Sequence, residues 1–171
     1  MKELYDSVWL QEQLAASLTM LAGAWAAIPQ ERWAALPPER IRRMSSWPAQ
    51  LHLYHLYQYE RITVAFAAIW QEGGRELTRE EEAELVRPYR EQETGWQQLS
   101  GAETMAGMRE QRRILLAQLA QTSDWDAVHD ILVGTHNLRW VIAKCFQHTL
   151  EHTTTLLQLA LFWDRTGFRG G

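Results

Sequence analysis

Four segments of the chain carry apolar side chains at a spacing of about 3.6 residues, which is the pattern of helices that bury one face. Glycine and proline are concentrated between these segments. No stretch of useful length alternates strictly between apolar and polar residues, as a half-buried strand would. The pattern therefore predicts an all-α fold with long helices over about residues 2–28, 45–71, 102–121 and 137–165.

Breaker and capping residues mark the ends of the first two helices. Pro29 is expected to end the first helix. The pair Ser45–Ser46 offers an N-cap to the second helix, and Pro48 suits its first turn, where the missing N–H is not needed. The pair Gly73–Gly74 is expected to end this helix, because glycine is common just beyond helix C-termini.

The more polar segment of residues 75–100 predicts a short additional helix. Thr78 and Glu81 have the spacing of a capping box, in which each side chain bonds the backbone N–H of the other residue. Pro88 is expected to close this helix after Arg87.

Four long helices with two long connections predict a four-helix bundle. The long connections precede and follow the second helix, and they permit a topology other than simple up-down-up-down. Residues 127–136 are expected to form a loop or a frayed helix end, and Asn137 is a suitable N-cap for the last helix. With 171 residues, the chain is expected to form a single domain over residues 1–171.

Composition limits the classes of partner. The net charge is −4, with 17 basic and 21 acidic residues, whereas a nucleic-acid interface needs a basic face. No apolar run approaches the roughly 20 residues that span a bilayer, and Met1–Asp6 lacks the features of a signal peptide. Cys145 is the one cysteine, so no internal disulfide forms. We therefore expect a cytoplasmic protein that binds neither nucleic acid nor membrane.

Three histidines lie on apolar stripes of the predicted helices. His148 and His152 are one turn apart on the last helix, and His55 lies between Leu51 and Tyr59 on the second. Two imidazoles at this spacing reach one point, and a third from a facing helix completes three legs of a tetrahedron. Core packing has no reason to concentrate imidazoles, since each must satisfy two ring nitrogens. The spacing alone supports a metal site and ordinary packing about equally.

Two other metal motifs are absent from the sequence. No glutamate lies three residues before any histidine, which excludes the Glu-x-x-His pairs of di-iron bundles. The His-Glu-x-x-His motif is also absent. Glu151 stands beside His152 and is turned away from the ligand face, so it is expected to be solvated or to accept a hydrogen bond from an imidazole. A site here would hold a single ion.

Other side chains near these histidines have two interpretations each. His52 is about 60° around the second helix from the candidate ligand, which suits a supporting residue better than a ligand. Tyr59 offers a hydroxyl to the pocket or packs with a polar tip. Cys145 is a fourth ligand, a nucleophile, or a small buried hydrophobic residue, and the last is the commonest case. His129 and His136 are expected to face solvent.

The order and spacing of three stretches, Met44–Glu60, Met108–Trp125 and Leu138–His152, resemble the DinB-like superfamily of four-helix bundles. The resemblance covers nearly the whole chain. It implies an up-down-down-up topology and frequent homodimers. It also implies one divalent metal ion held by three histidines, carried over here onto His55, His148 and His152.

The resemblance also suggests a class of reaction. Some relatives transfer low-molecular-weight thiols or isomerise thiol adducts, which implies a metal-dependent transferase or hydrolase that activates a thiol at the open metal position. The alternative is a non-catalytic metal-binding or interaction protein whose site bridges the second and last long helices. Imidazole ligands suit zinc, nickel and iron, and cellular supply decides among them. The polar segment of residues 75–100 and the nine tryptophans depart from the family pattern.

Overall fold

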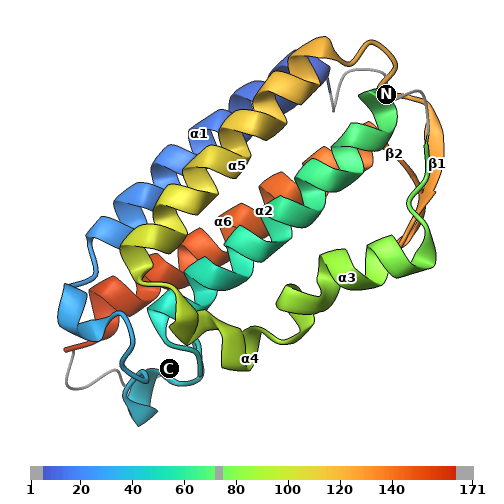
Figure 1. Ribbon diagram of the computed structural model, residues 1–171. Helices are drawn as coiled ribbons and strands as arrows, with labels where there is room; N and C mark the ends of the chain where they lie inside the picture. Colours follow the sequence, from blue (N-terminus) through green and yellow to red (C-terminus); the bar gives the residue numbers. More distant parts are fainter. Residues whose placement is uncertain (1–5, 72–74, 165–171) are drawn as a thin grey trace.

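The computed structural model describes residues 6–71 and 75–164, and helices make up most of this part. Four long helices lie side by side (Figure 1). They are α1 (Ser7–Ala26), α2 (Ala49–Gln71), α5 (Gly101–Gln121) and α6 (Leu138–Phe162). The shorter elements are the helices α3 (Arg79–Arg90) and α4 (Gln92–Gly95), the 3₁₀ turns η1 (Gln30–Arg32), η2 (Glu39–Ile41) and η3 (Trp96–Gln98), and the strands β1 (Val128–Ile131) and β2 (Gly134–Asn137).

The long helices pack in a defined order. Helix α2 contacts α5 and α6 most extensively, and α1 packs along α6. In Figure 1, α2 and α5 run in one direction while α1 and α6 run in the other. Helix α3 leads the chain back along α2, so that α5 begins at the same end of the molecule as α2. None of the described helices is long and apolar enough to cross a membrane.

Capping side chains begin four of the described helices, and the Asp6 carboxylate accepts from the Val8 and Trp9 N–H groups at the start of α1. The Thr78 hydroxyl accepts from the Glu81 N–H, and the Glu81 carboxylate accepts from the Thr78 N–H, which confirms the predicted capping box of α3. The Asn137 side chain caps α6, as predicted. A second capping box, Ser100 with Glu103, begins α5 and was not anticipated. Each box satisfies backbone donors that a helix start leaves unpaired.

Pro88 does not close α3, contrary to the prediction. The helix continues to Arg90 with the proline inside it. A proline at this position deprives the carbonyl of Glu84, four residues earlier, of its helical partner. Glu84 is exposed, so water can take that place. A surface helix therefore tolerates the proline more easily than a buried one would.

Ser45 and Ser46 do not cap α2, which begins at Ala49 directly after Pro48. The Ser45 hydroxyl instead lies 2.6 Å from Nε2 of His52. The expected helix ends at Gly73–Gly74 and Arg165, and the expected start before Asp6, lie outside the described residues.

A short hairpin replaces part of the loop predicted over residues 127–136. Strands β1 and β2 pair antiparallel, from Val128 opposite Asn137 to Ile131 opposite Gly134. Gly134 has φ +115°, a conformation that other residues rarely adopt. Ile131 is buried and anchors the hairpin on the core. The sequence signal was weak because four-residue strands are too short to show alternation.

A buried ion pair lies between the two main apolar clusters of the core. Glu60 and Arg112 have side chains that are each 1% exposed, and Nη2 of Arg112 lies 3.0 Å from Oε2 of Glu60. The guanidinium also donates to the Ser17 hydroxyl, at 3.0 Å, and to the Leu14 carbonyl. Sequence reasoning missed this pair, although Arg112 lies on the apolar stripe between Met108 and Leu115 and was a visible exception to it.

Candidate metal centre

The structure brings His55 of α2 together with His148 and His152 of α6. One ring nitrogen from each of the three lies within 4.8 Å of the other two. The Nε2 atoms of His55 and His148 are 2.8 Å apart. Tetrahedral zinc ligands at about 2.0–2.1 Å from the ion lie about 3.3 Å from one another. The three imidazoles could therefore close around one ion with small adjustments.

The Nδ1 atom of His55 is engaged on the side away from the cluster, where it hydrogen-bonds with Oε1 of Gln92. An amide oxygen only accepts, so the imidazole carries its proton on Nδ1 and keeps a lone pair on Nε2. A lone pair on the inward nitrogen is what a metal ligand requires, and an outer acceptor of this kind fixes the ring orientation. Gln92 belongs to α4, within the polar segment that departs from the family pattern.

His52 plays the corresponding part beside His152. The Nδ1 atoms of the two rings are 2.8 Å apart, and Nε2 of His52 lies 2.6 Å from the Ser45 hydroxyl. His52 is only 6% exposed. It lies outside the group of three clustered nitrogens, in the supporting position that the helical spacing favoured.

Three aromatic side chains enclose the clustered histidines. The ring of Tyr59 lies 4.4 Å from that of His148, and the ring of Tyr89 lies 4.7 Å from that of His55. Trp47 packs against His55 from another direction, at 5.4 Å. Sequence reasoning singled out Tyr59 but missed Trp47 and Tyr89, because neither lies on a helical stripe with the histidines.

Burial decides the protonation of the site. It lowers the pKa of His52 and His148 to about 4 and that of His152 to about 2, with smaller contributions from neighbouring imidazoles. The pKa of His55 is also lowered by burial, against the effect of its hydrogen bond to Gln92. At neutral pH these imidazoles are uncharged, which is the form that binds metal ions.

Tyr59 and Tyr89 keep their protons in the same pH range. Burial raises the pKa of the Tyr59 hydroxyl well above its ordinary value, and it raises the pKa of Tyr89 as well. The Tyr89 hydroxyl lies 3.4 Å from Nε2 of His55. It can therefore serve as a hydrogen-bond donor at the inner side of the cluster.

Cys145 lies close in sequence to the cluster but faces a different partner. Its thiol is 1% exposed, and its Sγ lies 3.4 Å from Oε2 of Glu60. Burial and the Glu60 carboxylate raise the pKa of the thiol far above its ordinary value. This favours a protonated buried thiol over a thiolate ligand or nucleophile.

Glu151 is exposed, and its Oε2 lies 3.7 Å from Nδ1 of His148, beyond hydrogen-bond distance. Its other oxygen accepts from the Gln147 amide at 2.9 Å. The carboxylate is thus mainly solvated, but it lies near the outward nitrogen of His148 and opposes the lowering of that residue's pKa by burial.

The remaining two histidines lie on the hairpin and not in the cluster. His129 packs edge-on against Trp70, with ring centroids 5.0 Å apart. His136 stacks on Trp140 at 3.5 Å. Both are half-buried, so the expectation that they simply face solvent was incomplete.

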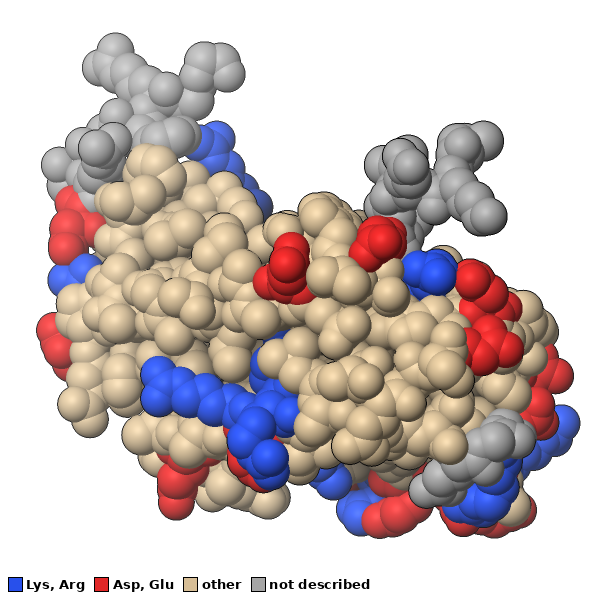
Figure 2. Space-filling model, turned by 90° about the horizontal axis from the view of Figure 1, so that it is seen from above, with Lys and Arg blue, Asp and Glu red and all other residues tan. Residues whose placement is uncertain are grey.

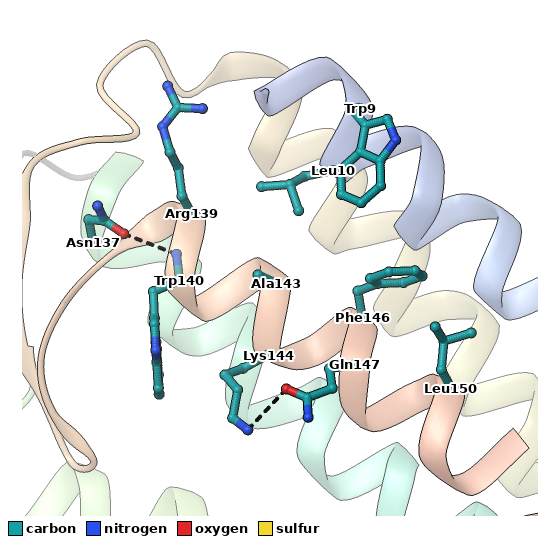
Figure 3. A pocket seen from close by; sticks show the side chains of 10 residues that line it. All are labelled: Trp9, Leu10, Asn137, Arg139, Trp140, Ala143, Lys144, Phe146, Gln147 and Leu150. Carbon is teal, nitrogen blue, oxygen red and sulfur yellow. Dashed lines mark hydrogen bonds between the residues drawn. The ribbon is translucent and has the colours of Figure 1, made fainter. Parts of the chain in front are cut away.

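A large open hollow of about 610 Å³ lies elsewhere, between α1 and the first half of α6. Figure 3 shows Trp9 of α1 beside Phe146 and Leu150 of α6 along its wall. Its lining includes none of the three aromatic side chains that enclose the histidines. The face in Figure 2 carries interspersed acidic and basic side chains with wide uncharged areas between them. The described residues on this face form no continuous basic patch.

Comparison with known families yields one finding. The model of the DinB superfamily matches residues 13–156, a range that contains all three clustered histidines. Searches of curated proteins and of solved structures found no match.

Proposed function

The chain belongs to the DinB superfamily, and on that basis we propose that it binds one divalent metal ion through His55, His148 and His152. The observation that carries the proposal is the convergence of their ring nitrogens within 4.8 Å. The outward hydrogen bonds of His55 and His152 add to it, because they leave the inward nitrogens available. Zinc, nickel and iron all accept this donor set.

We also propose the family's up-down-down-up bundle over a single domain. The opposite directions of α1 and α6 relative to α2 and α5 support it. The long connections are consistent with it, since α3 and α4 carry the chain back before α5 begins. This topology places α2 against α6, where the candidate ligands meet.

The reaction we propose is a metal-dependent transfer or hydrolysis that uses a low-molecular-weight thiol or water. Three neutral protein ligands leave one tetrahedral position open, as in catalytic zinc sites. When bound, the ion would lower the pKa of a thiol or water at that position. The protonated hydroxyls of Tyr59 and Tyr89 would donate hydrogen bonds to a substrate there. Trp47 would cover the histidines and limit the access of water.

A non-catalytic metal-binding role is the second candidate. It is favoured by the position of the cluster between α2 and α6, because an ion there would tie two long helices together. A bundle of this size does not need a metal ion to fold. A structural ion should nevertheless raise the melting temperature by several degrees when it is restored to stripped protein.

Elemental analysis of the purified protein tests the metal site directly. We expect about one zinc, nickel or iron ion per chain in the wild type, as a single three-histidine site requires. His148→Ala should lose the ion, whereas His136→Ala, which changes a histidine on the hairpin, should keep it. No stoichiometric metal in the wild type, or equal metal in both variants, overturns the proposal.

Activity measurements then separate the two candidates. Metal-loaded and stripped protein would be offered several low-molecular-weight thiols together with small electrophiles. Metal-dependent turnover that His148→Ala abolishes supports the enzyme. A metal-dependent gain in melting temperature with no turnover supports the structural role.

A further inference from the structure

A second, smaller hollow adjoins the candidate metal centre. It has a volume of about 220 Å³ and lies among α2, α3, the hairpin and the beginning of α6. Tyr59 and Tyr89 line it, and the same two rings pack on His148 and His55 at 4.4 and 4.7 Å. These tyrosines therefore form a shared wall, with the histidine cluster on one side and the hollow on the other.

The wall of this hollow is almost entirely apolar. Ile62 and Phe66 of α2 form its floor together with Val141 of α6, and all three are buried. Val133 lies at the turn of the hairpin and is 59% exposed, so it marks the side open to solvent. Apolar surface that faces an open space of this size favours an apolar occupant, because burying it releases ordered water.

Arg90 is the one charged side chain of the described wall. It ends α3, is exposed, and forms no ion pair with another described residue. A guanidinium with no ion-pair partner among the described residues, at the edge of an apolar hollow, suits a planar anion such as a carboxylate, which it can bind through two parallel hydrogen bonds.

The volume limits the size of the occupant. An apolar cavity of about 150 Å³ in another protein accommodates benzene. The 220 Å³ available here therefore suits one six-membered ring with a short substituent. The outer hollow of Figure 3 is larger, but it shares no wall with the clustered histidines.

We propose that this hollow binds the apolar part of the substrate, a single aromatic or similarly sized ring with a carboxylate that pairs with Arg90. The inference rests on the proposed function, because the ring would hold the substrate against Tyr59 and Tyr89, whose other side packs on the clustered histidines. The substrate class is thus a small aromatic acid. Recognition of this substrate depends on side chains of α3 and the hairpin, in addition to those of the long helices α2 and α6.

Fluorine NMR with 4-fluorobenzoate tests the site on full-length protein loaded with Zn²⁺ or Co²⁺. We expect saturable broadening of the fluorine signal with both ions. Faster relaxation should appear with Co²⁺ only, since a paramagnetic ion acts on nuclei close to it. Binding that shows the same relaxation with both ions places the probe elsewhere and overturns the inference.

Two hairpin valines provide a matched pair of variants. Val133 lines the hollow and Val128 does not, yet each is 59% exposed, so substitution of either leaves the core intact. Val133→Trp should weaken 4-fluorobenzoate binding by about tenfold, equivalent to about 1.4 kcal/mol, whereas Val128→Trp should leave it unchanged. Equal affinities in the two variants contradict the placement.

The pairing of the substrate carboxylate with Arg90 is tested separately. Arg90→Gln should weaken 4-fluorobenzoate by about fivefold, the range of an exposed ion pair, and leave the neutral probe fluorobenzene unaffected. Equal effects on both probes contradict the carboxylate assignment.

Metal content measured on the same samples keeps the two proposals distinguishable. One ion per chain without probe binding overturns this inference alone. Probe binding that depends on Val133, in protein that takes up no ion, overturns the metal function while it supports the hollow as a ligand site.

Discussion

The imidazoles of His52 and His152 face each other across the contact between α2 and α6, with their Nδ1 atoms 2.8 Å apart. One of these nitrogens must donate and the other accept. The Ser45 hydroxyl can accept from Nε2 of His52, which leaves Nδ1 of His52 free to accept from His152. This arrangement holds the lone pair of His152 on Nε2, the nitrogen that remains for a metal ion.

We expect His52→Ala to lower metal affinity by about 10–100-fold, the usual cost of losing an outer hydrogen-bond partner of a ligating histidine. Competition with a chromophoric chelator measures the affinity. His52→Asn retains an acceptor and should recover part of it, and His129→Ala on the hairpin is the control. If His52→Ala binds metal as tightly as the wild type, His52 has no positioning role.

The Glu60–Arg112 pair predicts a non-additive pair of substitutions. Arg112→Met leaves a buried carboxylate unpaired, which should lower the free energy of unfolding by about 3–5 kcal/mol. Adding Glu60→Leu removes the orphaned charge and should restore much of this loss. Urea unfolding followed by circular dichroism measures both.

Arg113→Met is the matched control for this pair. Its side chain is 69% exposed and pairs with Glu110 on the surface, so we expect a loss below about 1 kcal/mol. Additive effects of Arg112→Met and Glu60→Leu would show that the two groups do not depend on each other.

The lowered histidine pKa values predict that acid destabilises the metal-free protein. The pKa of His148 falls from 6.5 to about 4 on folding, so between these values the unfolded chain binds more protons than the folded one. Stability is therefore fully present above pH 6.5 and declines as the pH falls toward 4. Thermal melts of chelator-treated protein should show this decline. His148→Gln should have a shallower slope, and an unchanged slope would contradict the lowered pKa.

We expect a homodimer that uses the outer face of α1 and α6. Trp9 is 41% exposed and packs on Phe146, while Leu157 and Leu161 are 41% and 65% exposed further along α6. Apolar side chains that gather on one face of a helix pair favour association. Light scattering after size-exclusion chromatography should give twice the chain mass for the wild type and a single chain mass for Leu161→Glu.

Leu36→Glu is the control for the dimer, because Leu36 is equally exposed, at 63%, but lies in the connection between η1 and η2. It should remain dimeric. A monomeric wild type, or equal effects of the two substitutions, would count against this interface.

The sequence by itself determined which side chains share a helix face. The spacing of His148 and His152 on α6, and the apolar neighbours of His55 on α2, follow from the helical period, which depends only on local backbone geometry. The capping residues Thr78 and Asn137 were equally readable, since a cap acts within one turn. The helical period gave only a weak basis for choosing between His55 and His52 as the ligand. The resemblance to the family supplied that choice.

Only the tertiary structure decided which side chains contact the histidines. Gln92 and Tyr89 reach His55 from a segment that follows α2 by many residues, and no periodic pattern links them to it. The hollow beside Tyr59 exists because the hairpin and α3 come to rest against the same end of α2 and α6. Contacts of this kind depend on how helices pack and how their connections fold back, and these are properties of the whole chain that local spacing does not contain.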